Sequence, residues 1–139
     1  MACESGHLLV VIKLLNSGKC DVNQTGVAGW TPLIMAIIYD YQEIMMKLLA
    51  NKEIDVNQAG ERGVTPLMVA CQNGNKGIVQ CLLNYKCIDV NKGNFYGWTA
   101  LLLVCHAGTE KVLAQLLRHT SIDINLSLKV IIINTFLAN

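Results

Sequence analysis

The hydrophobic and polar positions of the chain form a pattern that returns at a fixed interval. An apolar run over residues 33–39 is followed by apolar side chains at helical spacing over residues 44–49, and the second segment returns over residues 78–83. Apolar side chains three and four residues apart are typical of a helix with one buried face. The polar stretch over residues 57–62, which contains glycine and asparagine, is typical of a turn or hairpin. Each unit is therefore predicted to contain two short antiparallel helices and a hairpin loop.

Short motifs keep the same step of 34 residues along the chain. Gly-Trp-Thr-Pro-Leu at residues 29–33 returns as Gly-Val-Thr-Pro-Leu at 63–67 and as Gly-Trp-Thr-Ala-Leu at 97–101. Asp-Val-Asn begins at residues 21, 55 and 89, and Asp-Ile-Asn begins at residue 123. Threonine is a favoured N-cap and proline is tolerated at the first helical position, so a helix is predicted to start after Thr31. The aspartates occur once per repeat, which indicates turn-forming residues rather than a pair of catalytic acids.

The predicted helices are too short to be stable by themselves. They have about eight to ten residues, whereas an isolated helix needs roughly 12 to 15 residues in water. Each unit can bury its apolar faces only against its neighbours, which predicts a solenoid with an extended concave surface.

The repeated residues resemble the ankyrin repeat over residues 2 to about 125. The resemblance is carried by the Gly-x-Thr-Pro-Leu opening, by Ala36 and Ala70 in the first helix, by Gly6-His7 and by the Asp-Val-Asn close. It implies an all-α, ankyrin-repeat solenoid of stacked antiparallel helix pairs joined by hairpin loops. We expect a single ankyrin-repeat domain over residues 1–139. Its parts are a partial repeat at 1–28, repeats at 29–62, 63–96 and 97–130, and a degenerate C-terminal segment at 131–139.

The chain departs from the ankyrin pattern at the residue that follows Thr-Pro-Leu. A histidine usually occupies this position and makes a polar link to threonine, but here Ile34, Met68 and Leu102 replace it. Apolar packing is expected to substitute for that link. In the third copy Ala100 replaces the proline, and we expect little structural effect because Thr99 still caps the helix.

Both ends of the chain depart from the repeat. Ala2 aligns with Ala36, so the chain is expected to begin in the middle of a first helix, and residues 131–135 lack the opening motif of a further repeat. The tail over residues 128–137 is strongly apolar, whereas solenoids normally end in capping repeats with a polar outer face. We expect a fragment of a longer array or a truncated gene product. The alternative is a tail that folds as an irregular apolar cap over the last helix pair. The open ends also predict end-to-end self-association.

Composition and charge narrow the function classes. The chain has 139 residues, of which 53% are apolar and 15% charged, so intrinsic disorder is excluded for most of it. A net charge of +1 provides no field to attract nucleic acid or an anionic membrane, and no apolar run approaches the roughly 20 residues of a membrane helix. The six cysteines follow no signal peptide, which favours a reducing compartment, the cytoplasm or alternatively the nucleus.

The sequence contains no pattern that supports catalysis or a cofactor. It has no glycine-rich phosphate loop, and no Cys-x-x-Cys spacing that would indicate a zinc site. Its three histidines, His7, His106 and His119, occupy different repeat positions, and a linear solenoid does not bring them together with a nucleophile and an acid. We therefore predict no enzyme activity, no cofactor and no metal.

The resemblance implies a binding surface on the hairpin tips, on the residue after each hairpin glycine and at the end of each first helix. In this chain that surface comprises Trp30, Ile38, Tyr39, Glu61, Arg62, Val64, Gln72, Asn73, Phe95, Tyr96, Trp98 and His106. Aromatic residues and arginine are favoured at interface hot spots. The hypothesis is a partly apolar groove with an aromatic patch at each end and Glu61 and Arg62 between them. The alternative for Trp30 and Trp98 is packing between neighbouring hairpins.

The resemblance predicts a protein–protein interaction module that binds a partner protein or peptide of unknown identity through its concave face and hairpin tips. One alternative is a recruitment domain of a larger enzyme or signalling protein whose catalytic part lies outside this chain. Another is a structural spacer without a partner of its own. The fold does not decide between them, because one repeat scaffold carries many unrelated functions.

Overall fold

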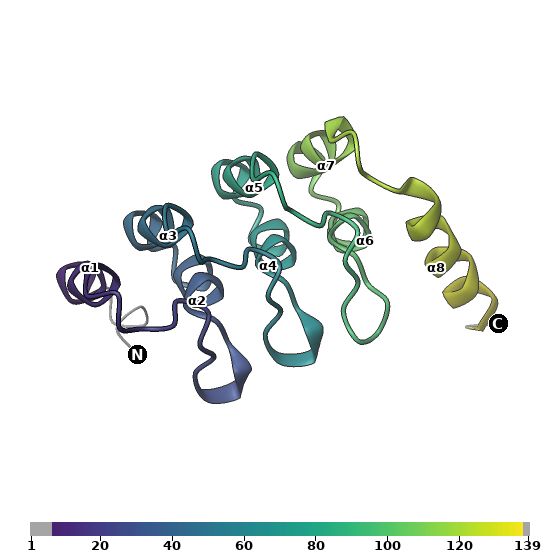
Figure 1. The fold of residues 1–139 in the computed structure, drawn as a ribbon. Helices are drawn as coiled ribbons and strands as arrows, with labels where there is room; N and C mark the ends of the chain where they lie inside the picture. The colour runs from purple at the N-terminus through teal and green to yellow at the C-terminus, as the bar shows by residue number, and fades with distance from the viewer. Residues whose placement is uncertain (1–6, 138–139) are drawn as a thin grey trace.

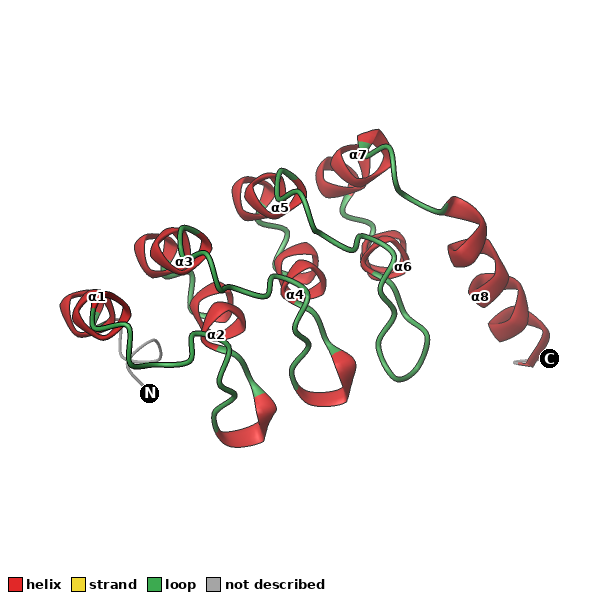
Figure 2. Ribbon diagram, in the orientation of Figure 1, coloured by secondary structure: helices red, strands yellow, loops and turns green. Residues whose placement is uncertain are grey.

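The computed structural model describes residues 7–137, and this part of the chain is helical without β-strands. The α-helices are α1 (Leu8–Asn16), α2 (Pro32–Ile38), α3 (Gln42–Leu49), α4 (Pro66–Gln72), α5 (Lys76–Leu83), α6 (Ala100–Ala107), α7 (Glu110–Arg118) and α8 (Ile124–Leu137). Two short 3-10 turns, η1 (Val27–Gly29) and η2 (Glu61–Gly63), form the tips of the first two hairpin loops (Figure 2).

The helices are stacked in two rows (Figure 1). The inner row holds α2, α4 and α6, and the outer row holds α1, α3, α5 and α7. Each inner helix packs on the outer helix that follows it, and neighbouring inner helices pack on each other. The hairpin loops project from the inner row, away from the outer helices. The predicted all-α solenoid of stacked helix pairs is confirmed.

Each inner helix starts where the motif predicts. The hydroxyl Oγ1 of Thr31 accepts a hydrogen bond from the backbone N–H of Ile34 at 3.2 Å. Thr65 and Thr99 make the same contact with the third helical residue, at 3.2 Å and 3.3 Å. Ala100 therefore leaves the cap of α6 intact although it replaces a proline, as predicted.

Apolar packing replaces the missing histidine between the inner helices. Ile34, Met68 and Leu102 are all buried, and Ile34 and Met68 expose none of their surface. The inner helices are buried on most sides, whereas the outer helices bury one face; in α3 that face is Ile44, Met45 and Leu48. The core is thus a continuous apolar layer that runs from one repeat to the next.

The Asp-Val-Asn motif links each repeat to the following one. The aspartate accepts a hydrogen bond from the backbone N–H of the asparagine, as Asp55 does for Asn57 at 2.9 Å, so its predicted role in the turn is confirmed. The asparagine side chain reaches further: Asn57 Nδ2 donates to the carbonyl oxygen of Cys87 at 2.6 Å, and the N–H of Asp89 donates to Asn57 Oδ1 at 2.8 Å. Asn23 and Asn91 form equivalent bridges.

The C-terminal part of the chain differs from the repeats. Helix α8 starts at Ile124 and runs without a break to Leu137, so the expected boundary between residues 130 and 131 lies inside it. No glycine or proline occurs in this stretch to stop the helix. The helix packs on α6, and its buried Ser127 has Oγ 3.3 Å from Oγ1 of Thr99. The tail is therefore a regular helix rather than an irregular cap. The expected start of the chain inside a helix, at Ala2, lies outside the described residues.

The asparagine bridge predicts a measurable loss of stability. In Asn57→Ala the carbonyl of Cys87 and the N–H of Asp89 lose their partner, and we expect the free energy of unfolding to fall by about 1–3 kcal/mol. The measurement is urea unfolding followed by circular dichroism. Asn125→Ala is the matched control, since Asn125 is exposed at the same motif position and bridges no later repeat in the described part of the chain. Equal losses in the two variants would contradict the bridge.

The left-handed backbone positions predict opposite effects of two small substitutions. Ala28 has φ of 63° and Gly108, which ends α6, has φ of 68°. Glycine adopts this region without the steric cost that a Cβ brings. We expect Ala28→Gly to stabilise the chain by up to about 1 kcal/mol and Gly108→Ala to destabilise it by about 1 kcal/mol or more, measured by the same unfolding assay. A change of the same sign in both variants would exclude the backbone explanation.

Candidate functional site

The predicted binding residues lie on the hairpin side of the solenoid. Glu61, Arg62, Phe95 and Tyr96 are at the tips of the second and third hairpins, and Trp30, Val64 and Trp98 follow the hairpin glycines. The remaining residues lie at the C-terminal ends of the inner helices: Ile38 and Tyr39 on α2, Gln72 and Asn73 on α4, and His106 on α6.

Backbone hydrogen bonds give each hairpin a defined shape. Gly60 N–H donates to the carbonyl oxygen of Val64 at 2.9 Å, and the first and third hairpins are closed by the equivalent bond, also at 2.9 Å. In the third hairpin the side chain of Asn94 adds two contacts, because its Oδ1 accepts from the N–H of Tyr96 at 2.9 Å and from that of Trp98 at 3.0 Å. The hairpins therefore hold the residues at their tips in fixed positions.

Neighbouring hairpins are in direct contact through aromatic rings on glycine. A Cβ at residue 60 would lie 2.5 Å from Cε3 of Trp30, so the indole packs on Gly60 of the next hairpin. Phe95 packs on Gly63 in the same way, and its N–H donates to the carbonyl oxygen of Arg62 at 3.0 Å. This contact leaves Trp30 half-buried. Trp30 therefore packs between neighbouring hairpins, which was the alternative to its role in a binding surface.

Two aromatic pairs lie in different repeats, one near the end of α2 and one on α6. On the first, Tyr39 stacks on Tyr41 with ring centroids 5.7 Å apart and an interplanar angle of 22°. On the second, Trp98 meets the ring of His106 edge-on at 5.5 Å, so Trp98 packs on its own repeat rather than between hairpins. Tyr41 was not among the residues predicted for the binding surface. It follows Tyr39 by two residues, and this spacing does not indicate that the two rings stack.

Glu61 and Arg62 lie on the hairpin between these two groups. Glu61 Oε1 is 3.7 Å from Nε of Arg62, and both side chains are exposed. A solvated pair of this kind adds little to stability, because water screens it. Both groups are therefore accessible for contacts outside the chain.

The predicted residues differ widely in their exposure. Phe95 is 81% exposed, Tyr96 66% and Tyr39 48%, whereas Val64 is half-buried beside its hairpin. Asn73 is exposed but also has a structural contact, since its Nδ2 donates to the carbonyl oxygen of Ile37 at 3.4 Å. The rings that contribute most free surface are thus those of Tyr39, Phe95 and Tyr96.

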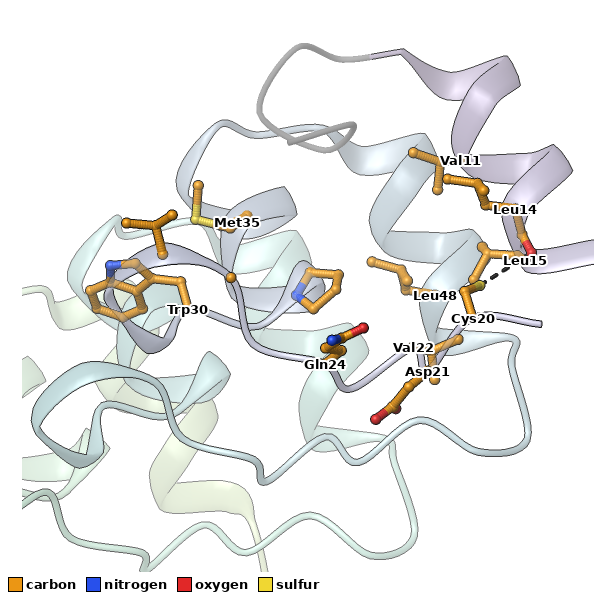
Figure 3. A pocket seen from close by; sticks show the side chains of 13 residues that line it. Val11, Leu14, Leu15, Cys20, Asp21, Val22, Gln24, Trp30, Met35 and Leu48 are labelled. Carbon is orange, nitrogen blue, oxygen red and sulfur yellow. Dashed lines mark hydrogen bonds between the residues drawn. The ribbon is translucent and has the colours of Figure 1, made fainter. Parts of the chain in front are cut away.

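A second concave feature lies at the N-terminal end of the stack. It is an apolar groove of about 190 Å³ between α1, α3 and the first hairpin, which we call the end groove. Figure 3 shows Val11 and Leu14 of α1 on one side and Trp30 and Met35 on the other, with Leu48 between them. Sequence reasoning missed this groove.

Cys71 of α4 carries a deeply buried thiol. Burial raises the pKa of the Cys71 thiol to about 12, so this thiol stays protonated and is a poor nucleophile at neutral pH. Cys105, which has the same position in the next repeat, is exposed, and both cysteines are free thiols. Over residues 7–137, no three His, Cys, Asp or Glu side chains come close enough to hold a metal ion. Within the same range, every helix is too short or too polar to cross a membrane.

Comparison with known proteins agrees with the repeated architecture. A family model described as ankyrin repeats (3 copies) matches residues 1–60 and 46–127. The putative ankyrin repeat protein YahD of Escherichia coli (strain K12) is 54% identical over 37 residues, which cover 27% of this chain and 18% of that protein. The similarity thus spans less than a fifth of that relative. Because the family model covers most of the chain, the chain belongs to the ankyrin repeat family.

Proposed function

We propose that this chain binds a partner protein or peptide through a concave surface formed by its hairpin tips and inner helix ends. Ankyrin repeats are generally protein–protein interaction modules and are typically not catalytic. The observation that carries the proposal is the large exposure of aromatic rings on this side: Phe95 and Tyr96 on the third hairpin and Tyr39 at the end of α2. Large apolar side chains that the fold leaves in water are typical of an interaction surface.

The exposed rings can be separated from those that support the fold. Trp30 packs on Gly60 and Trp98 packs on His106, so replacing either tryptophan removes contacts within the stack. Tyr39 and Tyr96 present more of their surface to solvent. Rigid aromatic side chains of this type carry much of the binding free energy in interfaces. We infer that Tyr39 and Tyr96 anchor the partner, with Glu61 and Arg62 contributing polar contacts between them.

A binding experiment tests this surface. The immobilised chain and its Tyr39→Ala/Tyr96→Ala variant are compared in affinity capture from an extract of the source organism, with quantitative mass spectrometry of the bound proteins. We expect a discrete protein to be captured by the unmodified chain and reduced at least about tenfold with the variant, since two hot-spot rings are removed.

The control variant is Met46→Ala/Leu117→Ala, which removes two exposed apolar side chains from the outer helices α3 and α7. It should capture the same protein as the unmodified chain, and circular dichroism should show that both variants are folded. A partner retained by the tyrosine variant would place binding elsewhere. Capture of nothing by any form would favour the structural spacer.

We also propose that copies of the chain associate end to end. The proposal is supported by the apolar end groove beside α1 and by exposed apolar side chains on α8, including Leu128, Ile131 and Ile132. These surfaces lie at the ends of the stack, so this association and the binding of a partner by Tyr39 and Tyr96 use different residues.

A further inference from the structure

A polar groove of about 330 Å³ lies between the outer helices α5 and α7, and we call it the outer groove. Both helices belong to the row that lies away from the hairpins (Figure 1). The groove is lined from the α5 side by Gln80, Leu83 and Asn84, and from the α7 side by Gln115, Arg118, His119 and Thr120. Ligand sites in proteins begin at about 300 Å³, so the outer groove has room for one aromatic ring.

The junction between the preceding two outer helices, α3 and α5, is filled by a tyrosine. Tyr85 follows the end of α5 and is half-buried. Its hydroxyl donates to the carbonyl oxygen of Leu49, the last residue of α3, at 2.8 Å. The last carbonyls of a helix have no partner within the helix, so the tyrosine supplies the donor that the end of α3 needs.

One repeat later this contact is not made. Leu83 holds the position of Leu49, and His119 holds that of Tyr85, each 34 residues further along the chain. The imidazole of His119 bonds to its own loop instead, because its Nδ1 accepts from the backbone N–H of Ser121 at 3.3 Å. Within residues 7–137, the carbonyl oxygen of Leu83 accepts no hydrogen bond. The outer groove thus lies at the place that a tyrosine ring fills between α3 and α5.

A second acceptor at the outer groove also lacks a donor. Gln115 is 8% exposed, and its Oε1 is buried without a hydrogen-bond partner among the described residues. The orientation of its amide is fixed, because Nε2 donates to the carbonyl oxygen of Lys76 at 3.2 Å and to Oε1 of Gln80 at 3.1 Å. A buried acceptor without a donor is costly, so the groove favours a ligand that brings a donor.

The corresponding groove between α1 and α3 lacks both features. Its volume is similar, about 300 Å³, but exposed Lys47 takes the place of Gln115. The carbonyl oxygen of Leu15, which is equivalent to that of Leu83, accepts from the backbone N–H of Gly18 at 3.4 Å. The two free acceptors therefore belong to the outer groove and are not a common property of the stack.

We propose that the outer groove binds a tyrosine side chain of a partner protein, whose hydroxyl donates to the carbonyl oxygen of Leu83 as Tyr85 donates to Leu49. The buried amide of Gln115 beside it makes the groove selective for donors. A phosphorylated tyrosine brings acceptor oxygens in place of the donor, so it leaves both acceptors unpaired. The site shares no residue with the surface around Tyr39 and Tyr96, so this proposal is independent of the function proposed above.

The border of the groove favours a polypeptide over a free phenol. Exposed amide, guanidinium and hydroxyl groups surround it, and these groups can pair with the peptide groups on either side of a bound ring; they belong to Gln80, Asn84, Arg118 and Thr120. A buried ring within a polar rim is the usual arrangement of a protein interface.

Nuclear magnetic resonance with model compounds tests the chemistry of the groove. The isotope-labelled chain is titrated separately with N-acetyltyrosinamide, N-acetylphenylalaninamide, N-acetyl-O-phosphotyrosinamide and p-cresol, and the side-chain amide signals of Gln115 are followed. We expect N-acetyltyrosinamide to shift these signals and to bind about three- to tenfold more tightly than N-acetylphenylalaninamide, since one hydrogen bond separates the two compounds. The phosphorylated compound and p-cresol should both bind more weakly than N-acetyltyrosinamide.

His119→Tyr tests the same idea within the chain. It places a phenol at the position that Tyr85 holds one repeat earlier, so we expect the new side chain to fill the groove. The variant should lose the N-acetyltyrosinamide shifts at Gln115 and should unfold at a higher urea concentration than the unmodified chain. Asn51→Tyr, at the same repeat position beside the groove between α1 and α3, is the matched control and should bind the compound normally. Circular dichroism checks that both variants are folded.

Each contrary result overturns the proposal at a stated point. Equal binding of the tyrosine and phenylalanine compounds excludes recognition of the hydroxyl. Tighter binding of the phosphorylated compound would assign the groove to an anion held by Arg118, and p-cresol that binds as tightly as N-acetyltyrosinamide would assign it to a free phenol. Unshifted Gln115 signals at every concentration, or normal binding by His119→Tyr, exclude the site itself. None of these results bears on partner capture through Tyr39 and Tyr96.

Discussion

The contact between successive repeats is the interaction on which the rest of this structure depends. Its repeat helices have seven to nine residues, fewer than an isolated helix needs in water. Stability therefore comes from the apolar layer between inner helices and from the asparagine bridges, each of which satisfies a carbonyl and an N–H of the next repeat. Each bridge also fixes the position of one loop relative to the loop of the next repeat. The stack of repeats therefore sets the spacing between the hairpins.

That spacing explains how a chain of short helices presents a defined surface. The hairpins are held by their own backbone bonds and by aromatic contacts such as Trp30 on Gly60 and Phe95 on Gly63. Some rings on this side are consequently part of the support, while Tyr39 and Tyr96 extend from it into solvent. Composition alone would not separate these roles, because both kinds of ring occur at the same few repeat positions. The distinction comes from the packing: Trp30 lies on Gly60 and Trp98 lies against His106, whereas Tyr39 and Tyr96 keep 48% and 66% of their surface exposed.

The sequence predicts those features whose cause is local and recurs. Thr31 and its repeats cap helices because the hydroxyl and its donor are three residues apart, and Asp55 holds a turn two residues long. Contacts with a partner about 30 residues away are harder to predict. The motif marks Asn57 as recurrent but does not reveal that its amide reaches Cys87 and Asp89. Helix α8 lies outside the repeat register, so the repeated motifs do not predict it.

A stack of repeats differs from a globular fold in the place where apolar surface remains uncovered. A globule closes its core on all sides, whereas a stack of repeats buries each unit between two neighbours and leaves a leading face at one end and a trailing face at the other. In the described part of the chain, the apolar groove beside α1 lies at one end of the stack, and exposed apolar side chains of α8 lie at the other. The same constraint that makes a single repeat unstable therefore leaves apolar surface at both ends of the described stack.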